Sequence, residues 1–298
     1  PRSTLFPYTT LFRSERCLEH PELWGGLIDL EEASNGAAQA SQVWQEVGND
    51  DPDAEDQIAF RDNQRYVPRL VRGASDSRER EAQIAWSASR SAIFAPGGAY
   101  LITGGLGKLG LMVAHWMAER GARHLVLVSR RRLPERSTWA NLATEGDAYE
   151  AALRIRAIEN LGCTVKVVSG DVADFATMSE LFAEFGHSMP SLRGVIHAAG
   201  VFNFHPLTEI DIDVLRTCLR PKIIGAWVLH KLTEHESLDF FVAFSSGASV
   251  WSAKGLAHYA AANQLLDVMA HHRRAMGLPA LARSEEHTSE LQSRTLIS

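Results

Sequence analysis

The segment from residue 99 to residue 282 alternates short apolar runs with stretches of helical periodicity, and this alternation constrains the fold more than any other feature. Strands that are apolar throughout are typical of a parallel sheet covered on both faces. The predicted strands are residues 99–103, 124–129, 164–169, 194–198 and 239–245. The predicted helices are residues 109–120, 148–160, 176–185, a long helix within 212–235, and 257–276. Right-handed crossovers then predict an α/β fold with a doubly wound parallel sheet.

A glycine-rich turn follows the first of these strands, with the pattern G-x-G-x-x-G at Gly105, Gly107 and Gly110. The pattern alone is weak evidence, but a strand before it and a helix after it are the context of a dinucleotide site. Residues without Cβ let a diphosphate approach, and the helix N-terminus offers it N–H groups. A turn without a ligand is the alternative. We expect the cofactor to contact Thr103, Gly104, Gly105, Leu106, Gly107, Leu109 and Gly110.

The end of the second strand predicts which nicotinamide cofactor binds. An NAD site usually carries Asp or Glu there, bonded to the ribose hydroxyls. Here the strand ends in Ser129-Arg130-Arg131-Arg132, and Arg130 stands where the acid would be. A guanidinium can hold a 2′-phosphate through two hydrogen bonds, whereas a carboxylate would repel it. The sequence therefore predicts NADPH, held near Ser129, Arg130 and Arg131; a solvated basic loop is the alternative.

Two further strand ends are expected at the same edge of the sheet. Asp171 and Val172 follow the third strand, and Asp171 is a candidate partner for the adenine amino group. The fourth strand ends in His197-Ala198-Ala199-Gly200, whose small residues leave room for the nicotinamide ribose. No metal site is expected, because the three cysteines share no metal-ligand spacing; they suit a reducing cytosol.

Four polar residues downstream are candidates for catalysis. Ser246 ends the last predicted strand, and Tyr259 lies thirteen residues later, at the start of a helix. Asn263 is at i+4 from Tyr259, so both project from one helix face. Lys222 lies near the start of the preceding long helix, in Arg220-Pro221-Lys222.

Together these residues predict carbonyl reduction. Ser246 can hydrogen-bond a carbonyl oxygen, and Tyr259 can donate the proton. A free phenol has a pKa of about 10, so its anion needs support near neutral pH, which the Lys222 ammonium supplies. Asn263 can position that ammonium directly or through water. Each residue alone is more often structural; their combination downstream of the glycine-rich turn points to an active site.

These residues carry a family resemblance. In classical short-chain dehydrogenases the lysine lies four residues after the tyrosine, but here Asn263 takes that place and Lys222 lies on the earlier helix. This swap is characteristic of the ketoreductases of polyketide and animal fatty acid synthases. The chain resembles the ketoreductase domain of a modular polyketide synthase over residues 24–282. The resemblance implies a Rossmann-like fold and NADPH-dependent reduction of a β-ketoacyl thioester on an acyl carrier protein, beside other synthase domains in the cytoplasm.

The region before the glycine-rich turn is expected to be structural. It holds strand-like pieces at residues 27–30, 57–61 and 65–70, an acidic stretch at 49–56, and no cluster of titratable groups. The sequences LWGGLIDL and YVPRLVR resemble the end of the non-catalytic structural subdomain of the same family, most of which is absent. We therefore expect a remnant of that subdomain over residues 15–96 and the catalytic domain over residues 97–282.

Both ends of the chain resemble translated adapter oligonucleotides from short-read DNA sequencing: STLFPYTTLFRS at residues 3–14 and RSEEHTSELQSR at 283–294. Residues 1–14 and 283–298 are therefore expected to be adapter-derived. Residues 278–282 are expected to start a sixth strand of the sheet. The second adapter-like segment is charged and lacks strand alternation, so we expect that it cannot continue an apolar buried strand and that the neighbouring strand loses ladder partners. The chain as written is then expected to be poorly soluble or inactive.

Short motifs of this family are associated with product stereochemistry. One group carries Leu-Asp-Asp after His-Ala-Ala-Gly-Val and makes the D-β-hydroxyl, but here that place reads Phe202-Asn203-Phe204. The other group carries a tryptophan eight residues before the tyrosine, which is Trp251. Phe202 and Trp251 are therefore candidates for stereocontrol, and the L-β-hydroxyl product is predicted. Alternatively, Trp251 only packs its loop.

Two other functions are alternatives to this prediction. A stand-alone reductase of a small ketone fits the fold, but the moved lysine and the upstream region argue against it. A non-catalytic NADPH-binding scaffold module would be favoured by loss of Ser246, Tyr259 or Lys222, and all three are present. The net charge of −6 gives no basic surface for nucleic acid, and no apolar run reaches the roughly 18–20 residues of a membrane span.

Overall fold

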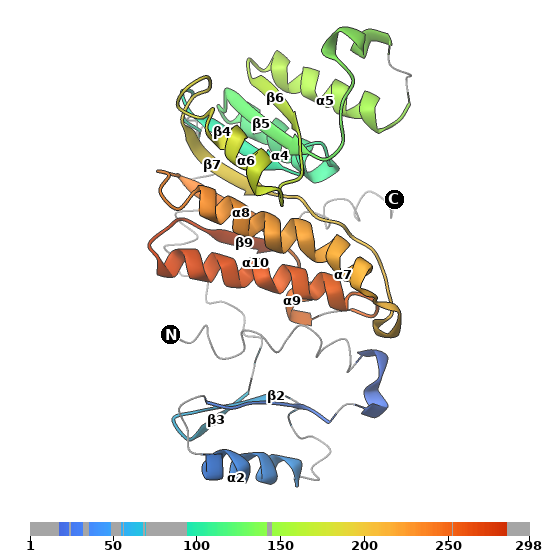
Figure 1. The fold of residues 1–298 in the computed structure, drawn as a ribbon, viewed down its shortest axis with the longest axis vertical. Helices are drawn as coiled ribbons and strands as arrows, with labels where there is room; N and C mark the ends of the chain where they lie inside the picture. The colour runs from blue at the N-terminus through green and yellow to red at the C-terminus, as the bar shows by residue number, and fades with distance from the viewer. Residues whose placement is uncertain are drawn as a thin grey trace, which may run out of the picture.

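The computed structural model describes residues 18–23, 25–31, 36–48, 55, 57–67, 69, 94–141, 145–251 and 253–284. Within them, a six-stranded sheet has the order β6-β5-β4-β7-β8-β9, and a smaller sheet has the order β1-β2-β3. Figure 1 shows the smaller sheet and helix α2 at one end of the molecule and the larger sheet, with its helices, at the other. The adapter-like residues 1–14 and 285–298 lie outside the described residues.

The six-stranded sheet is parallel throughout. Chain order reverses at β4, whose neighbours are β5 and β7, and such a switch point is where ligands bind in doubly wound sheets. This topology confirms the predicted fold class. The strands are β4 (Ala99–Thr103), β5 (His124–Ser129), β6 (Thr164–Ser169), β7 (Leu192–His197), β8 (Phe240–Ser245) and β9 (Leu281–Ser284).

Helices cover both faces of this sheet because side chains of successive strand residues point to opposite faces. On one face α4 (Lys108–Glu119) and α5 (Asp147–Asn160) pack on strand residues such as Ile102 and Leu127. On the other face α6 (Phe175–Phe182) and α8 (Gly225–Leu232) pack on Leu101 and Val126. Helix α10 (Ala257–Ala275) joins this second layer, where Leu266 meets Ala243 of β8 and Ala226 of α8.

The long helix predicted within residues 212–235 is interrupted. Helix α7 (Ile212–Leu219) is followed by a π-helical turn, Arg220–Ile224, and only then by α8. Pro221 gives the reason: it has no N–H to donate to the preceding turn, so regular α-helical bonding cannot pass through it. The turn places Lys222 almost completely buried, at 5% exposure, at the edge of the sheet.

The smaller sheet consists of β1 (Leu27–Asp29), β2 (Gln57–Arg61) and β3 (Gln64–Tyr66). Strands β2 and β3 form a hairpin whose turn residues, Asp62 and Asn63, both have positive φ, as type I′ turns require. Helix α2 (Gly36–Val47) has no buried residue. The strand predicted at residues 65–70 corresponds to β3, which begins one residue earlier and ends at Tyr66. Most of the acidic stretch at residues 49–56 lies outside the described residues.

The expectation that the strand next to the sixth one loses its ladder partners is wrong. Arg283 and Ser284, from the adapter-like segment, belong to β9 and pair with Phe244 and Ser245 of β8. Backbone hydrogen bonds form the ladder, so pairing needs no apolar side chains, and Leu281 at 46% exposure shows that β9 is not a buried strand. The expectation of poor solubility or inactivity stays a prediction.

None of the helices in the described part of the chain combines the length and the apolar character needed to cross a bilayer. Among the same residues, no three His, Cys, Asp or Glu side chains gather closely enough to hold a metal ion.

Candidate active site

The glycine-rich turn links β4 to the start of α4. Gly104 has φ of +68°, and a Cβ there would lie 2.6 Å from the Ala198 carbonyl oxygen. Only glycine fits this combination of conformation and close approach. Gly107 is the N-cap of α4, and no side chain caps the helix. The first N–H groups of α4 therefore remain available to an anion such as a diphosphate.

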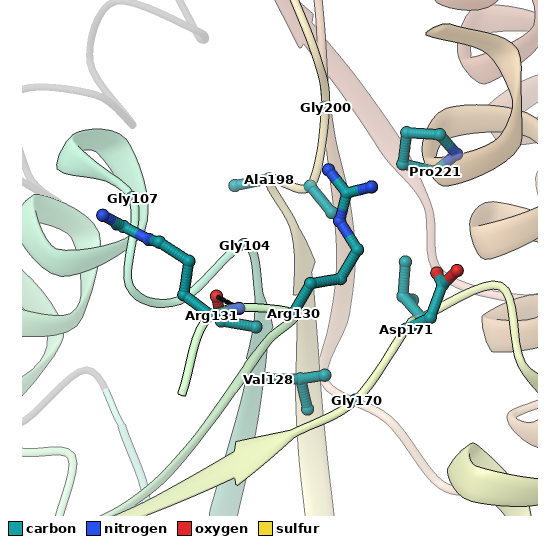
Figure 2. Close-up of a pocket in the computed structure, with 13 residues that line it drawn as sticks. Gly104, Gly107, Val128, Arg130, Arg131, Gly170, Asp171, Ala198, Gly200 and Pro221 are labelled. Atoms are coloured by element: carbon teal, nitrogen blue, oxygen red, sulfur yellow. Dashed lines mark hydrogen bonds between the residues drawn. The ribbon is translucent and has the colours of Figure 1, made fainter. Parts of the chain in front are cut away.

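A cavity of about 300 Å³ lies at the carboxyl ends of β4 to β7, next to this turn (Figure 2). It is bounded by the glycine-rich turn, by the loops after β5, β6 and β7, and by the π-helical turn. Small residues dominate its wall, which leaves the groove open to an extended dinucleotide. The lining residues are Gly104, Gly107, Val128, Ser129, Arg130, Arg131, Gly170, Asp171, Val172, Ala198, Ala199, Gly200 and Pro221.

The remaining residues predicted to contact the cofactor support this wall or lie beside it. Thr103 and His197 are buried and joined by a hydrogen bond of 2.7 Å between Oγ1 and Nδ1. Leu106 is buried in the core at 2% exposure. Gly105, Leu109 and Gly110 continue the turn into the first turn of α4 but do not line the cavity.

The two arginines after β5 differ in their surroundings. Figure 2 shows their guanidinium groups pointing in opposite directions. Arg131 forms an ion pair with Asp147 of α5 and donates to the carbonyl oxygen of Leu106 in the glycine-rich turn. Arg130 extends into the cavity (Figure 2). Arg130 is therefore the better candidate for a 2′-phosphate, and Arg131 ties the turn to α5.

Asp171 already has two partners. One carboxylate oxygen accepts from the Ala173 N–H at 2.9 Å, and the other accepts from Arg220 Nε at 3.0 Å. Sequence reasoning singled out Asp171 but missed Arg220. Arg220 stands two residues before Lys222 and opens the π-helical turn that borders the cavity, but nothing around it in the sequence pairs it with Asp171.

Lys222, Asn263 and Tyr259 form one buried network. The Lys222 ammonium donates to Asn263 Oδ1 at 2.7 Å and to the Phe244 carbonyl oxygen at 2.9 Å. Asn263 Nδ2 in turn donates to the Tyr259 carbonyl oxygen at 2.8 Å. Lys222 Nζ lies 5.3 Å from the centroid of the Tyr259 ring. The structure thus brings together a lysine and a tyrosine that are 37 positions apart in the sequence, with Asn263 in direct contact.

Ser246 follows the end of β8, beside this network. Its Oγ accepts from the Ala248 N–H at 3.1 Å, so the hydroxyl group is held at the start of α9 (Ala248–Trp251). Ser246 and Tyr259 are 3% and 4% exposed. Two hydroxyl groups and a buried ammonium therefore share one end of the sheet, a set that can bind and protonate a carbonyl oxygen.

His197 supports the network from the cofactor side. Burial, together with the positive charge of Lys222, lowers the pKa of His197 to about 3. The imidazole is therefore neutral near pH 7, so it adds no charge next to the Lys222 ammonium.

Of the two residues predicted to govern stereochemistry, Phe202 packs its ring edge-on against Tyr259, with the centroids 5.0 Å apart. Its side chain is 57% exposed, so it borders the open side of the site. Trp251 is the last residue of α9, and its side chain lies outside the described residues.

Comparison with known proteins identifies the family. Residues 98–285 match the family model described as KR domain. The 6-methylsalicylic acid synthase of Aspergillus niger is 39% identical over 265 residues, which are 89% of this chain and 14% of that protein. The 5-methyl-1-naphthoate synthase of Streptomyces sahachiroi is 38% identical over 260 residues, again 14% of its length. The chain thus spans only a small part of the curated relatives it matches.

A solved structure described as an A1-type ketoreductase is 36% identical and superimposes with a TM-score of 0.73, covering 92% of this chain and 52% of that one. The superposition with this structure agrees with the fold described above. The chain belongs to the KR domain family, the ketoreductases of polyketide synthases.

Proposed function

We propose that this chain uses NADPH to reduce a β-ketoacyl thioester, carried on an acyl carrier protein, to the β-hydroxyacyl thioester during polyketide extension. The observation that carries the proposal is the buried Lys222–Asn263–Tyr259 network beside a cavity with a glycine-rich turn. The relatives are much longer synthases, which supports other synthase domains as partners.

The residues around the cavity fit NADPH. The uncapped N-terminus of α4 suits the diphosphate, and Arg130 offers a guanidinium to the 2′-phosphate. Ala198, Ala199 and Gly200 leave the wall near the network free of bulky side chains. When bound, NADPH supplies the hydride that adds to the carbonyl carbon.

The side chains of the network handle the oxygen and its proton. Ser246 and Tyr259 donate hydrogen bonds to the ketone oxygen, and Tyr259 gives up its proton as negative charge develops there. The Lys222 ammonium stabilises the phenolate left behind, because an opposite charge nearby favours the ionised form. Asn263 and the Phe244 carbonyl fix the ammonium in place. Solvent then returns a proton to Tyr259.

Phe202 and Trp251 are proposed to select the substrate face, which gives the L-β-hydroxyl product. The Phe202 ring packs against the Tyr259 ring and is largely exposed, which supports a contact between Phe202 and the incoming acyl chain. Chiral chromatography of the reduced thioester checks this, and the D-product would contradict it.

The reaction is tested by NADPH oxidation with acetoacetyl-N-acetylcysteamine and with the same acyl group on a carrier protein. The chain as written is expected to be poorly soluble or inactive, so the assay uses a version in which the family's own sequence replaces the two adapter-like segments. In that version we expect turnover with both thioesters and faster turnover with the carrier-bound group. A folded chain that binds NADPH but reduces neither thioester would instead be a scaffold module. Reduction of small free ketones in preference to both thioesters would favour a stand-alone reductase.

A further inference from the structure

Glu19 joins two loops that are far from it in the sequence. It lies two residues before the short 3₁₀ helix Pro21–Leu23, in the region expected to be structural. One carboxylate oxygen accepts from the Leu207 N–H at 2.8 Å, and the other accepts from the Gly255 N–H at 2.8 Å. The side chain is half-buried. In Figure 1 this blue segment lies next to the loop between β7 and α7.

The two loops also contact each other. The His205 N–H donates to the Gly255 carbonyl oxygen at 2.9 Å. Gly255 has φ of +77°, and a Cβ there would lie 3.4 Å from the Phe204 ring. The Gly255 carbonyl oxygen therefore accepts a hydrogen bond from the His205 loop, and the Gly255 N–H donates one to Glu19. The three segments meet at Gly255.

Both loops lead directly to the candidate active site. Leu207 lies five residues after Phe202, whose ring meets the Tyr259 ring, and Gly255 lies four residues before Tyr259. Beside this contact, His258 is fully buried, and its Nε2 lies 2.8 Å from Asn203 Oδ1. A shift of either loop would therefore move Phe202 relative to the Tyr259 hydroxyl.

We propose that Glu19 is a positioning residue, which holds the Phe202 loop against the loop before Tyr259 and so shapes the substrate side of the active site. The carboxylate suits this role because hydrogen bonds to an ionised acceptor are stronger than neutral ones, and its two oxygens serve one loop each. The substrate part of this inference rests on the proposed function. The region before the glycine-rich turn then contributes to substrate binding as well as to the fold.

The variants are E19A, E19Q and E22A. E19A removes both acceptors, whereas E19Q keeps one acceptor oxygen and turns an amide N–H₂ toward the other loop. E22A is the matched control, because Glu22 is 65% exposed in its side chain and its carboxylate contacts His20 at 3.4 Å.

The first measurement is hydrogen–deuterium exchange at the Leu207 and Gly255 amides, which needs no substrate. We expect exchange at both amides to quicken by about tenfold or more in E19A, to a smaller extent in E19Q, and not in E22A. Unchanged exchange at both amides in a folded E19A would overturn the inference, whatever the enzyme does.

The second measurement is steady-state reduction of acetoacetyl-N-acetylcysteamine. In E19A we expect the KM for the thioester to rise by about tenfold, kcat to change less, and the minor β-hydroxyl enantiomer to increase. NADPH affinity should match the wild type. If the wild type reduces no thioester, the proposed function fails while the exchange test still stands. If the wild type is active and E19A keeps its KM and enantiomer ratio, the inference about Glu19 fails alone.

Discussion

The cofactor pocket is built from the ends of neighbouring strands, whereas the substrate side depends on contacts between distant segments. The pocket wall comes from the loops after β4, β5, β6 and β7, and its supports Thr103 and His197 are almost completely buried. On the substrate side, Phe202 and Phe204 are 57% and 63% exposed, and Glu19 holds their loop from nearly 200 residues away. Because the two sides are built from different segments, the loops on the substrate side can change in sequence while the groups that bind the cofactor and transfer the proton stay in place.

The largest effect on activity is expected from a substitution of Tyr259, which lies between the cofactor pocket and the substrate side. Tyr259→Phe removes one hydroxyl group and almost no volume from a residue that is 4% exposed. Loss of a general acid lowers kcat by about 10²- to 10⁴-fold, while cofactor affinity should stay within about twofold because no pocket residue changes. Stopped-flow reduction and NADPH titration measure the two quantities. Activity near that of the wild type would show that another group donates the proton.

The two sides should also differ in their tolerance of a single methyl group. Gly104 and Gly255 both have positive φ, but a Cβ would lie 2.6 Å from backbone at Gly104 and no closer than 3.4 Å to any atom at Gly255. Gly255→Ala should cost about 1–2 kcal/mol of unfolding free energy from the backbone conformation alone. Gly104→Ala should cost about 3 kcal/mol or more, since the Ala198 backbone must also move, and NADPH binding should be lost.

Urea denaturation and NADPH titration of both variants test this contrast. Equal destabilisation, with cofactor binding intact in Gly104→Ala, would mean that the cofactor side is no more tightly packed than the substrate side.

Cofactor preference is a property of the pocket alone. Arg130→Asp should weaken NADPH by about 10- to 100-fold relative to NADH, because it replaces a charge-assisted contact with repulsion. Arg131→Ala is the matched comparison: that side chain is paired with Asp147 and the Leu106 carbonyl, so its loss should affect both cofactors alike. Dissociation constants for NADPH and NADH provide the measurement. If Arg130→Asp weakened the binding of NADPH and NADH equally, the assignment of Arg130 to the 2′-phosphate would be wrong.

The same division explains what the sequence could predict. Apolar runs predicted β4, β5 and β6 with their observed bounds, and the glycine pattern predicted the turn, because these signals are local. The lysine was placed on the right segment, but the π-helical turn that orients it was missed, although Pro221 marks the break. Side-chain patterns say little about backbone pairing, and for that reason the pairing of Arg283 and Ser284 with β8 was not predicted.

Contacts between segments that are distant in the chain produce no pattern in the sequence from which they could be predicted. Glu19 stands in a sequence with no fingerprint, and its partners are backbone N–H groups, which every residue except proline carries. The Asp171–Arg220 pair was missed because Asp171 lies in the loop after β6, whereas Arg220 opens the π-helical turn after α7. Only the fold brings such groups together, so the substrate side could not be predicted from the sequence to the same depth as the pocket.

The smallest predicted effect concerns pH and the buried histidines of both sides. Burial lowers the pKa of His197 to about 3 on the cofactor side and, together with His205, lowers the pKa of His258 on the substrate side. For His197, between about pH 3 and the unfolded pKa of about 6.5, the unfolded chain binds more protons than the folded chain, so the free energy of unfolding falls as the pH falls. The lowered pKa of His258 acts in the same direction. The stabilisation is complete above about pH 6.5, and for His197 the loss reaches at most about 1.4 kcal/mol per pH unit.

His197→Asn separates the contribution of the cofactor side, since asparagine keeps a polar atom near the position of Nδ1, which bonds Thr103 Oγ1, and does not titrate. Between pH 6.5 and pH 5.5 the variant should lose about 1 kcal/mol less unfolding free energy than the wild type, and His258→Gln should recover a smaller amount. Urea denaturation at the two pH values measures both. The fully enclosed imidazole of His197, 1% exposed and bonded to Thr103, should dominate because a proton there has no water to solvate it. If both variants recovered the same unfolding free energy, the substrate side would be as well sealed from solvent as the pocket. The contrast between the two sides would then rest on the exposed aromatic residues alone.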